Sequence, residues 1–152
     1  MRDTVIFCHS EHHGNTKKLV SALAEKYGAE VVPVPGADAT DVSEYKAVGF
    51  ASGIYFEKFH SSLFSLAEGL RGLSGKKCFL LFTAGMPNPR NADSLAKKLK
   101  ALGAEVAGVY GCRGWDTVGP LRLFGGIAKG RPNEKDIAGA IKFFEDKVLT
   151  RD

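Results

Sequence analysis

The chain has 152 residues, 44% of them hydrophobic and 25% charged, as expected for a soluble globular protein with one domain spanning residues 1–152. No apolar run approaches the roughly 20 residues that a membrane-spanning helix needs. The net charge is +4, but the basic residues form short pairs rather than a stripe interleaved with aromatics, which argues against a nucleic-acid-binding protein.

The amino terminus enters a strand pattern directly, without the layout of a signal peptide. The three cysteines, Cys8, Cys78 and Cys112, are far apart in the sequence and form no CxxC pair. This spacing favours reduced thiols in a cytoplasmic protein and argues against a disulfide framework or a zinc or iron–sulfur site. We expect Cys8 to be a core residue.

Five short runs rich in β-branched and aromatic residues predict strands. In chain order they are Thr4–His9, Glu30–Val34, Lys46–Ala51, Lys76–Thr83 and Glu105–Tyr110. Near-continuous apolar runs of this length suit strands that are buried on both faces of a parallel sheet. Pro33 would remove a donor from the strand ladder, so the second strand is expected at the edge of the sheet.

Four stripes of apolar residues, spaced three or four apart, predict helices. They run over Leu19–Tyr27, Leu63–Leu73, Leu95–Leu102 and Ile137–Val148. Gly28 and Gly103 are expected to end the first and third helices, and Asn133 to open the fourth. Because parallel strands need crossovers, and crossovers place helices on both faces, the alternation predicts a doubly wound α/β fold.

Residues 111–131 interrupt the alternation, with six glycines and no clean periodicity. A segment of this length without secondary structure in a compact domain is usually functional or mobile. It is a candidate lid, subunit contact or partner surface, and the sequence does not choose among the three.

In a doubly wound sheet, ligands bind beyond the carboxyl ends of the strands. The loop after the first predicted strand supplies hydroxyls, an amide and a glycine, and a helix starts near Asn15. Free N–H groups and the positive dipole end of a helix make an anion site, with phosphate preferred. The candidate phosphate-binding residues are Ser10, His12, His13, Gly14, Asn15 and Thr16. Neither a P-loop motif nor a dinucleotide-binding fingerprint occurs there.

The loops after the third and fourth predicted strands complete the candidate site. The first of them combines a glycine turn with aromatics on which a planar ligand can stack, and comprises Ser52, Gly53, Ile54, Tyr55 and Phe56. The second, Thr83, Ala84 and Gly85, is small enough for its backbone to lie against a ligand. Together the three loops predict a site for a nucleotide with a flat ring system.

The first loop resembles that of the flavodoxin family, whose signature there is commonly Ser/Thr-x-Thr-Gly-Asn-Thr. Here Ser10 and Gly14-Asn15-Thr16 are kept, with one extra residue and histidines in place of the central threonine. The resemblance spans nearly the whole chain and implies a flavodoxin-like, five-stranded parallel sheet of order 2-1-3-4-5 in three layers. It also implies one noncovalent FMN, with its phosphate on residues 10–16 and its ring between the loops that begin at Ser52 and Thr83.

Two departures from the family bear on activity. Electron-carrying flavodoxins are typically strongly acidic, whereas this chain is at +4, so a partner selected by charge would differ. The loop at 83–89 has no aromatic, which leaves one face of the flavin open to a substrate or covered by Trp115. Because the redox chemistry belongs to the flavin, no catalytic side chain is expected, and the partner is a redox protein or a small-molecule electron donor or acceptor.

The leading interpretation is an FMN-binding protein that acts as an electron carrier or as a small NAD(P)H- or quinone-type oxidoreductase. The alternative is a non-redox α/β module that binds a phosphorylated ligand or a partner protein.

The histidines of the first loop have separate interpretations. His9, His12 and His13 are not expected to bind a metal, because adjacent histidines cannot easily aim at one ion from a strand-to-helix turn. We hypothesise that His12 or His13 hydrogen-bonds the FMN phosphate; the alternative is a solvent-exposed loop histidine. His60 is expected to be a surface or capping residue.

Overall fold

The computed structural model describes residues 3–10, 14–34, 40–116 and 125–149. Its strands are β1 (Thr4–His9), β2 (Glu30–Pro33), β3 (Ala47–Tyr55), β4 (Lys58–Phe59), β5 (Lys77–Ala84) and β6 (Glu105–Arg113). Its α-helices are α1 (Asn15–Tyr27), α2 (Ser61–Gly69), α3 (Asp93–Ala101) and α4 (Glu134–Phe143). A 3-10 turn, η2 (Pro89–Ala92), precedes α3, and a π-helical turn, η4 (Phe144–Val148), continues α4.

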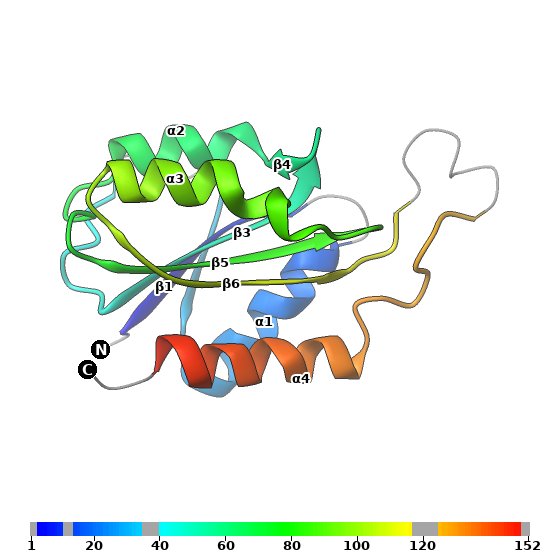
Figure 1. Cartoon of the computed structure of the whole chain (residues 1–152). Helices are drawn as coiled ribbons and strands as arrows, with labels where there is room; N and C mark the ends of the chain where they lie inside the picture. The colour runs from blue at the N-terminus through cyan, green and yellow to red at the C-terminus, as the bar shows by residue number, and fades with distance from the viewer. Residues whose placement is uncertain (1–2, 11–13, 35–39, 117–124, 150–152) are drawn as a thin grey trace.

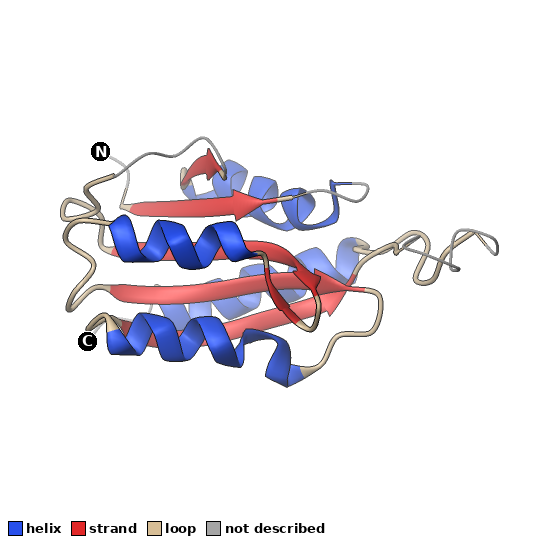
Figure 2. Ribbon diagram, turned by 90° about the horizontal axis from the view of Figure 1, so that it is seen from above, coloured by secondary structure: helices blue, strands red, loops and turns tan. Residues whose placement is uncertain are grey.

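Five strands form a parallel sheet in the order β2-β1-β3-β5-β6. Helices α2 and α3 cover one face of this sheet, and α1 and α4 cover the other (Figure 1). The view from above shows the strands side by side beneath α2 and α3 (Figure 2). The predicted doubly wound, three-layer flavodoxin-like fold and its strand order are therefore confirmed, with β2 at the predicted edge.

The sequence does not predict β4, which pairs antiparallel with the last residues of β3. β3 accordingly runs on to Tyr55 instead of ending at Ala51. The two residues of the hairpin turn, Phe56 and Glu57, have positive φ angles of 52° and 69°. Turns of this kind normally use Asn or Gly, so the sequence gives no hairpin signal here.

Alternate residues of β1 pack on opposite faces of the sheet. Val5 and Phe7 belong to the core cluster that includes the α2 and α3 side chains. Ile6 and Cys8 belong to the cluster that includes side chains of α1 and of η4. A strand buried on both faces explains the near-continuous apolar run in the sequence.

All three cysteines are buried, and burial raises the pKa of Cys8, Cys78 and Cys112 to about 12. Their thiols therefore stay protonated at neutral pH and serve as small apolar packing groups, as expected for Cys8.

The predicted helix ends at Gly28 and Asn133 are confirmed. Gly28 adopts φ 71° and its N–H donates to Ala24 O at 2.9 Å. The Asn133 side chain accepts from two backbone N–H groups at the start of α4. α2 ends at Gly69, before the end of the predicted stripe at Leu73. Within the described ranges, no helix combines the length and apolar character that crossing a bilayer requires.

Candidate functional site

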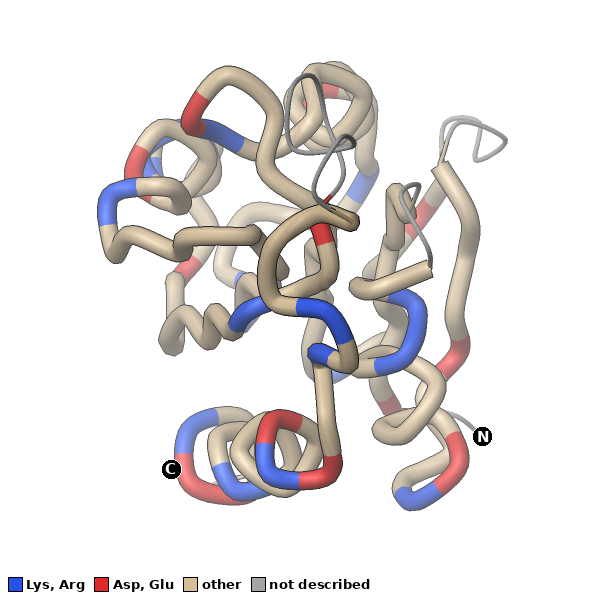
Figure 3. Tube along the Cα trace, turned by 90° about the vertical axis from the view of Figure 1, so that its right-hand side faces the viewer, with Lys and Arg blue, Asp and Glu red and all other residues tan. Residues whose placement is uncertain are grey.

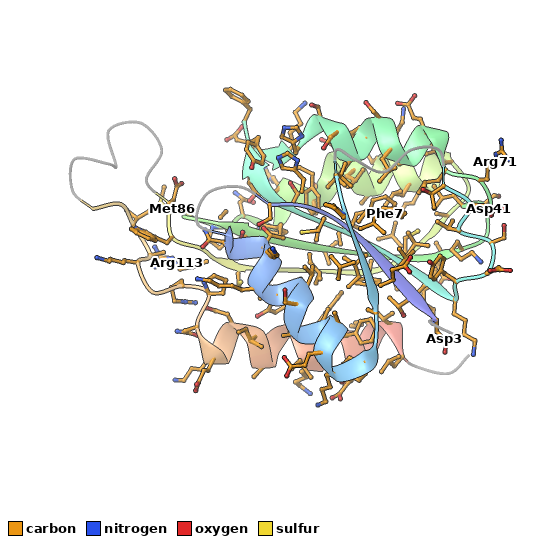
Figure 4. The ribbon with its side chains drawn as sticks, turned by 180° about the vertical axis from the view of Figure 1, so that it is seen from behind. Asp3, Phe7, Asp41, Arg71, Met86 and Arg113 are labelled. Carbon is orange, nitrogen blue, oxygen red and sulfur yellow. The ribbon has the colours of Figure 1, made fainter. Side chains whose placement is uncertain are left out.

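The loops that follow β1, β3, β5 and β6 border a cavity of about 680 Å³. It lies at the carboxyl end of the parallel strands, the end that carries Met86 and Arg113, whereas Asp41 and Arg71 mark the opposite end (Figure 4). Eight predicted site residues line it: Asn15, Gly53, Ile54, Phe56, Thr83, Ala84, Gly85 and Trp115. The structure thus brings residues from three predicted loops and from the 111–131 segment to one site.

In the turn from β1 into α1, the residue at the cap position makes no side-chain hydrogen bond, whereas a hydroxyl from the start of the turn binds an N–H in the first turn of the helix. Gly14 occupies the cap position at φ 66°, and no atom of the described residues lies within 4 Å of the place where a Cβ would stand. The Ser10 hydroxyl accepts a hydrogen bond from the Lys17 N–H at 3.1 Å. His12 and His13 lie outside the described residues.

Asn15 connects this helix start to the cavity. Its side chain is only 6% exposed, and Nδ2 donates to Trp115 O at 2.8 Å. Its Oδ1 is buried and has no hydrogen-bond partner within the described part of the chain. A buried amide oxygen on the wall of a cavity is costly unless a ligand or water donates to it. The adjacent Thr16 hydroxyl is bonded to Thr83 instead, at 2.8 Å.

The predicted site residues at the end of β3 lie in two different environments. Gly53, Ile54 and Phe56 line the cavity, and the Phe56 side chain is 96% exposed. Ser52 is fully buried, where its hydroxyl donates to Gly53 O at 2.5 Å and accepts from the His60 N–H at 3.1 Å. Ser52 therefore holds the β3 end against the start of α2 and does not face the cavity.

Tyr55 packs away from the cavity, against two histidines. His9 and His60 stack with ring centroids 3.7 Å apart, and Tyr55 meets both rings edge-on. His9 Nδ1 donates to Val34 O at 2.8 Å, and His60 Nδ1 accepts from the Ser62 N–H, which confirms His60 as a capping residue. Across the residues that the structure describes, no group of three or more His, Cys, Asp or Glu side chains is arranged to hold a metal ion.

The loop after β5 passes very close to the 111–131 segment. Arg113 Nε donates to Gly85 O at 3.1 Å. A Cβ on Gly85 would stand 2.7 Å from the Ile127 side chain and 2.9 Å from that of Asp116. Only glycine therefore fits at this position without displacing a neighbouring side chain.

The described parts of the 111–131 segment form an antiparallel ribbon that projects from the end of β6 (Figure 1). Asp116 and Ile127 exchange two backbone hydrogen bonds of 3.0 and 2.9 Å, and the Trp115 N–H donates to Arg131 O at 3.0 Å. This pairing has no hydrophobic period, which is why the sequence pattern does not reveal it.

The ribbon holds Trp115 at the wall of the cavity. Its indole Nε1–H donates to Gly125 O at 2.8 Å, and Lys129 Nζ lies 5.6 Å from the ring centroid. Trp115 thus lines the cavity, and its covering one face of a flavin stays a prediction.

Other residues that line the cavity are not among the predicted site residues, although several belong to the predicted loop 83–89 or to the 111–131 segment. They include Glu57, Lys58, Met86, Asn88, Arg90, Asn91, Ser94, Gly114, Asp116 and Ile127. Glu57 and Lys58 follow from the hairpin that the sequence does not predict. Asn88, Arg90 and Asn91 lie where the loop after β5 enters η2, and the Asn88-Pro89 cap is the one local signal that could have found them.

Comparisons with known proteins identify the family. The model of the Flavodoxin domain matches residues 6–116. An uncharacterized protein of Methanocaldococcus jannaschii is 36% identical over 141 residues, which are 91% of this chain and 93% of that protein. A solved flavodoxin from the domain Archaea has a TM-score of 0.67 at 15% identity, with 96% of each chain covered. The general stress protein 14 of Treponema denticola, solved in complex with FMN, has a TM-score of 0.62 at 11% identity, with 95% of this chain and 98% of that one covered. The chain belongs to the flavodoxin domain family.

Proposed function

We propose that this protein binds one FMN noncovalently in the cavity at the carboxyl end of the sheet and transfers electrons to and from a partner. The observation that carries the proposal is the cavity of about 680 Å³ itself, which joins the start of α1 to the ends of β3 and β5. A helix start and two backbone-rich loops are the parts that a phosphate and a flat ring need.

The phosphate is assigned to the turn from Ser10 to Thr16. The residue at the cap position of α1, Gly14, makes no side-chain hydrogen bond, and among the described residues no atom lies within 4 Å of an added Cβ there. The Ser10 hydroxyl binds the N–H of Lys17. Backbone N–H groups and the positive end of the helix dipole favour a phosphate dianion there. Because the Thr16 hydroxyl is bonded to Thr83, Thr16 is expected to act through its backbone N–H.

The flavin ring is assigned to the space between the β3–β4 hairpin and the loop that starts at Thr83. Trp115 lines the cavity and is available as an aromatic wall for a planar ring, whereas the exposed Phe56 side chain lies at the cavity mouth. Gly53, Ala84 and Gly85 let backbone approach the ring closely. When bound, FMN supplies the redox chemistry, and the chain holds it, orients it and controls access to it.

A paired substitution tests the phosphate assignment. Asn15→Asp places a carboxylate at the start of α1. The helix dipole stabilises this negative charge, but the charge repels a phosphate, so FMN affinity should fall at least about 10-fold. The matched control is Asn133→Asp, which changes the cap of α4 away from the cavity and should leave the affinity unchanged. Quenching of FMN fluorescence measures the dissociation constants, and thermal melting of the apoproteins checks folding. Equal affinities in the two variants would contradict the assignment.

The type of activity needs a separate experiment. An electron carrier should accept electrons from a reduced protein or mediator but show no rapid bleaching of the flavin by NADH or NADPH under anaerobic conditions. Rapid bleaching would instead identify a small NAD(P)H-dependent oxidoreductase. A protein that takes up no FMN but binds a phosphorylated ligand would identify a non-redox module.

A further inference from the structure

We propose that the mouth of the cavity is a docking surface for an acidic redox protein, an inference that rests on the proposed function. The surface, called here the basic rim, consists of residues at this cavity: two exposed apolar residues, Phe56 and Met86, and four cations, Lys58, Arg90, Arg113 and Lys129.

All four cations are at the cavity. Lys58 and Arg90 line it, Arg113 bonds the carbonyl of Gly85 on its wall, and Lys129 lies over the Trp115 ring. All four side chains are exposed. Figure 3 views the molecule from this end and shows basic segments on several of the loops that face the reader.

Within the described residues, none of these four cations forms an ion pair. The ion pairs within the described residues involve other basic residues, Lys26, Lys46, Lys98, Arg131 and Lys142. Two carboxylates, Glu57 and Asp116, also line the cavity, so among the described residues four cations against two anions leave an excess of positive charge at the rim. An excess of one sign at a cleft steers partners of the opposite sign.

The surface also includes exposed apolar side chains, as protein–protein interfaces do. Phe56 is 96% exposed and Met86 is 78% exposed, two of the four large apolar side chains that are exposed in the described residues. Aromatic residues, Met and Arg are enriched where proteins meet, and charged residues gather at the edge of such interfaces. A small donor bound inside the cavity would not account for apolar side chains that face outward at its mouth, whereas a protein partner covers them.

The hairpin turn supports the same conclusion. Phe56 and Glu57 both occupy left-handed backbone conformations, which are unfavourable for residues other than Gly, Asn and Asp. Strain of this kind persists where the surrounding structure imposes it and concentrates at functional sites. Here it places an aromatic side chain almost wholly in solvent.

The test uses the FMN-loaded protein and two haem proteins of opposite charge, an acidic b-type cytochrome and a basic c-type cytochrome. Stopped-flow spectroscopy measures the second-order rate at which each oxidises the reduced protein. The rate with the acidic cytochrome should fall about 10-fold between about 20 mM and 300 mM salt, because screening removes the attraction. The rate with the basic cytochrome should rise over the same range.

Variants then locate the surface. Lys58→Gln/Arg90→Gln/Lys129→Gln should lower the low-salt rate with the acidic cytochrome several-fold and flatten its salt dependence. Arg71→Gln, at the opposite end of the molecule (Figure 4), is the matched control and should change neither. Met86→Ser should lower the rate at all salt concentrations without changing the salt slope.

Three results would overturn the docking surface while leaving FMN binding intact: a rate with the acidic cytochrome that rises with salt, a triple variant that behaves like Arg71→Gln, or faster low-salt reaction with the basic cytochrome. A protein that takes up no FMN would overturn the proposed function and the docking surface together.

Discussion

The hydroxyl oxygens of Thr16 and Thr83 lie 2.8 Å apart, and both side chains are buried. This hydrogen bond joins the first turn of α1 to the end of β5 across 67 positions of sequence. It therefore fixes the proposed phosphate turn relative to the loop that is proposed to hold the flavin ring.

Thr16→Val should lower the free energy of unfolding by about 1–3 kcal/mol, because it leaves the buried Thr83 hydroxyl without this partner. The double variant Thr16→Val/Thr83→Val should recover part of that loss, since it removes both polar groups. Urea unfolding of the wild type, both single variants and the double variant measures these free energies as a double-mutant cycle. If the losses in unfolding free energy of the two single variants sum to that of the double variant, the two hydroxyls do not stabilise each other.

Gly85→Ala should weaken FMN binding by about 10-fold or more, because its Cβ would collide with Ile127 and Asp116 and displace the ribbon that positions Trp115. Gly69→Ala is the matched control. Gly69 is the last residue of α2, and no atom of the described residues lies within 4 Å of an added Cβ. FMN titration of both variants checks the prediction, and an affinity for Gly85→Ala equal to that of Gly69→Ala would contradict it.

Stability should fall in acid partly through Asp136, which accepts two hydrogen bonds of 2.6 Å from Arg131. Bonding to Arg131 lowers the pKa of Asp136 below its ordinary value. A carboxyl whose pKa is lower in the folded state stabilises the fold above its unfolded pKa of about 3.9, and this stability is lost as the pH falls through the folded pKa. Urea unfolding between pH 7 and pH 2.5 should thus show a smaller acid loss for Asp136→Asn than for the wild type.

Asp146→Asn serves as the control for this experiment. Asp146 pairs with Lys142 on the exposed surface of the last helix, where an ion pair contributes little. The free energy of unfolding of Asp146→Asn should change with pH in nearly the same way as that of the wild type. A parallel curve for Asp136→Asn as well would show that the Arg131–Asp136 pair does not control the acid loss.

The affinity for FMN should weaken as the pH rises from 6 to 9 if His12 or His13 contacts the phosphate. A nearby dianion favours the imidazolium and raises the histidine pKa, so deprotonation removes an attractive charge. His12→Gln and His13→Gln, measured separately, identify which histidine is responsible. A dissociation constant that stays flat over this range rules out both.

The sequence predicts the fold well because its strongest signals are local. Strands buried on both faces produce continuous apolar runs, and Gly28 and Asn133 mark helix ends by their backbone chemistry alone. The hairpin at Phe56 is missed because its turn uses residues that normally avoid positive φ. The ribbon around Trp115 is missed because its pairing depends on tertiary contacts rather than on a sequence period.

The site is predicted less completely than the fold. A sequence pattern indicates which loops meet at the carboxyl end of the sheet, but not which side chain of each loop turns inward. Tyr55 and Phe56 are adjacent and both aromatic, yet Tyr55 packs on His9 and His60 whereas Phe56 is 96% exposed at the mouth of the cavity. The hairpin and the histidine stack determine these two orientations, and the sequence pattern reveals neither feature.

The most direct test of FMN binding is the visible absorption spectrum of the purified protein before and after addition of excess FMN and removal of the unbound portion. The proposed site predicts a yellow protein that holds one FMN per chain, released on unfolding and bleached reversibly by a chemical reductant. A folded protein that is colourless and retains no FMN after this treatment would contradict the proposal.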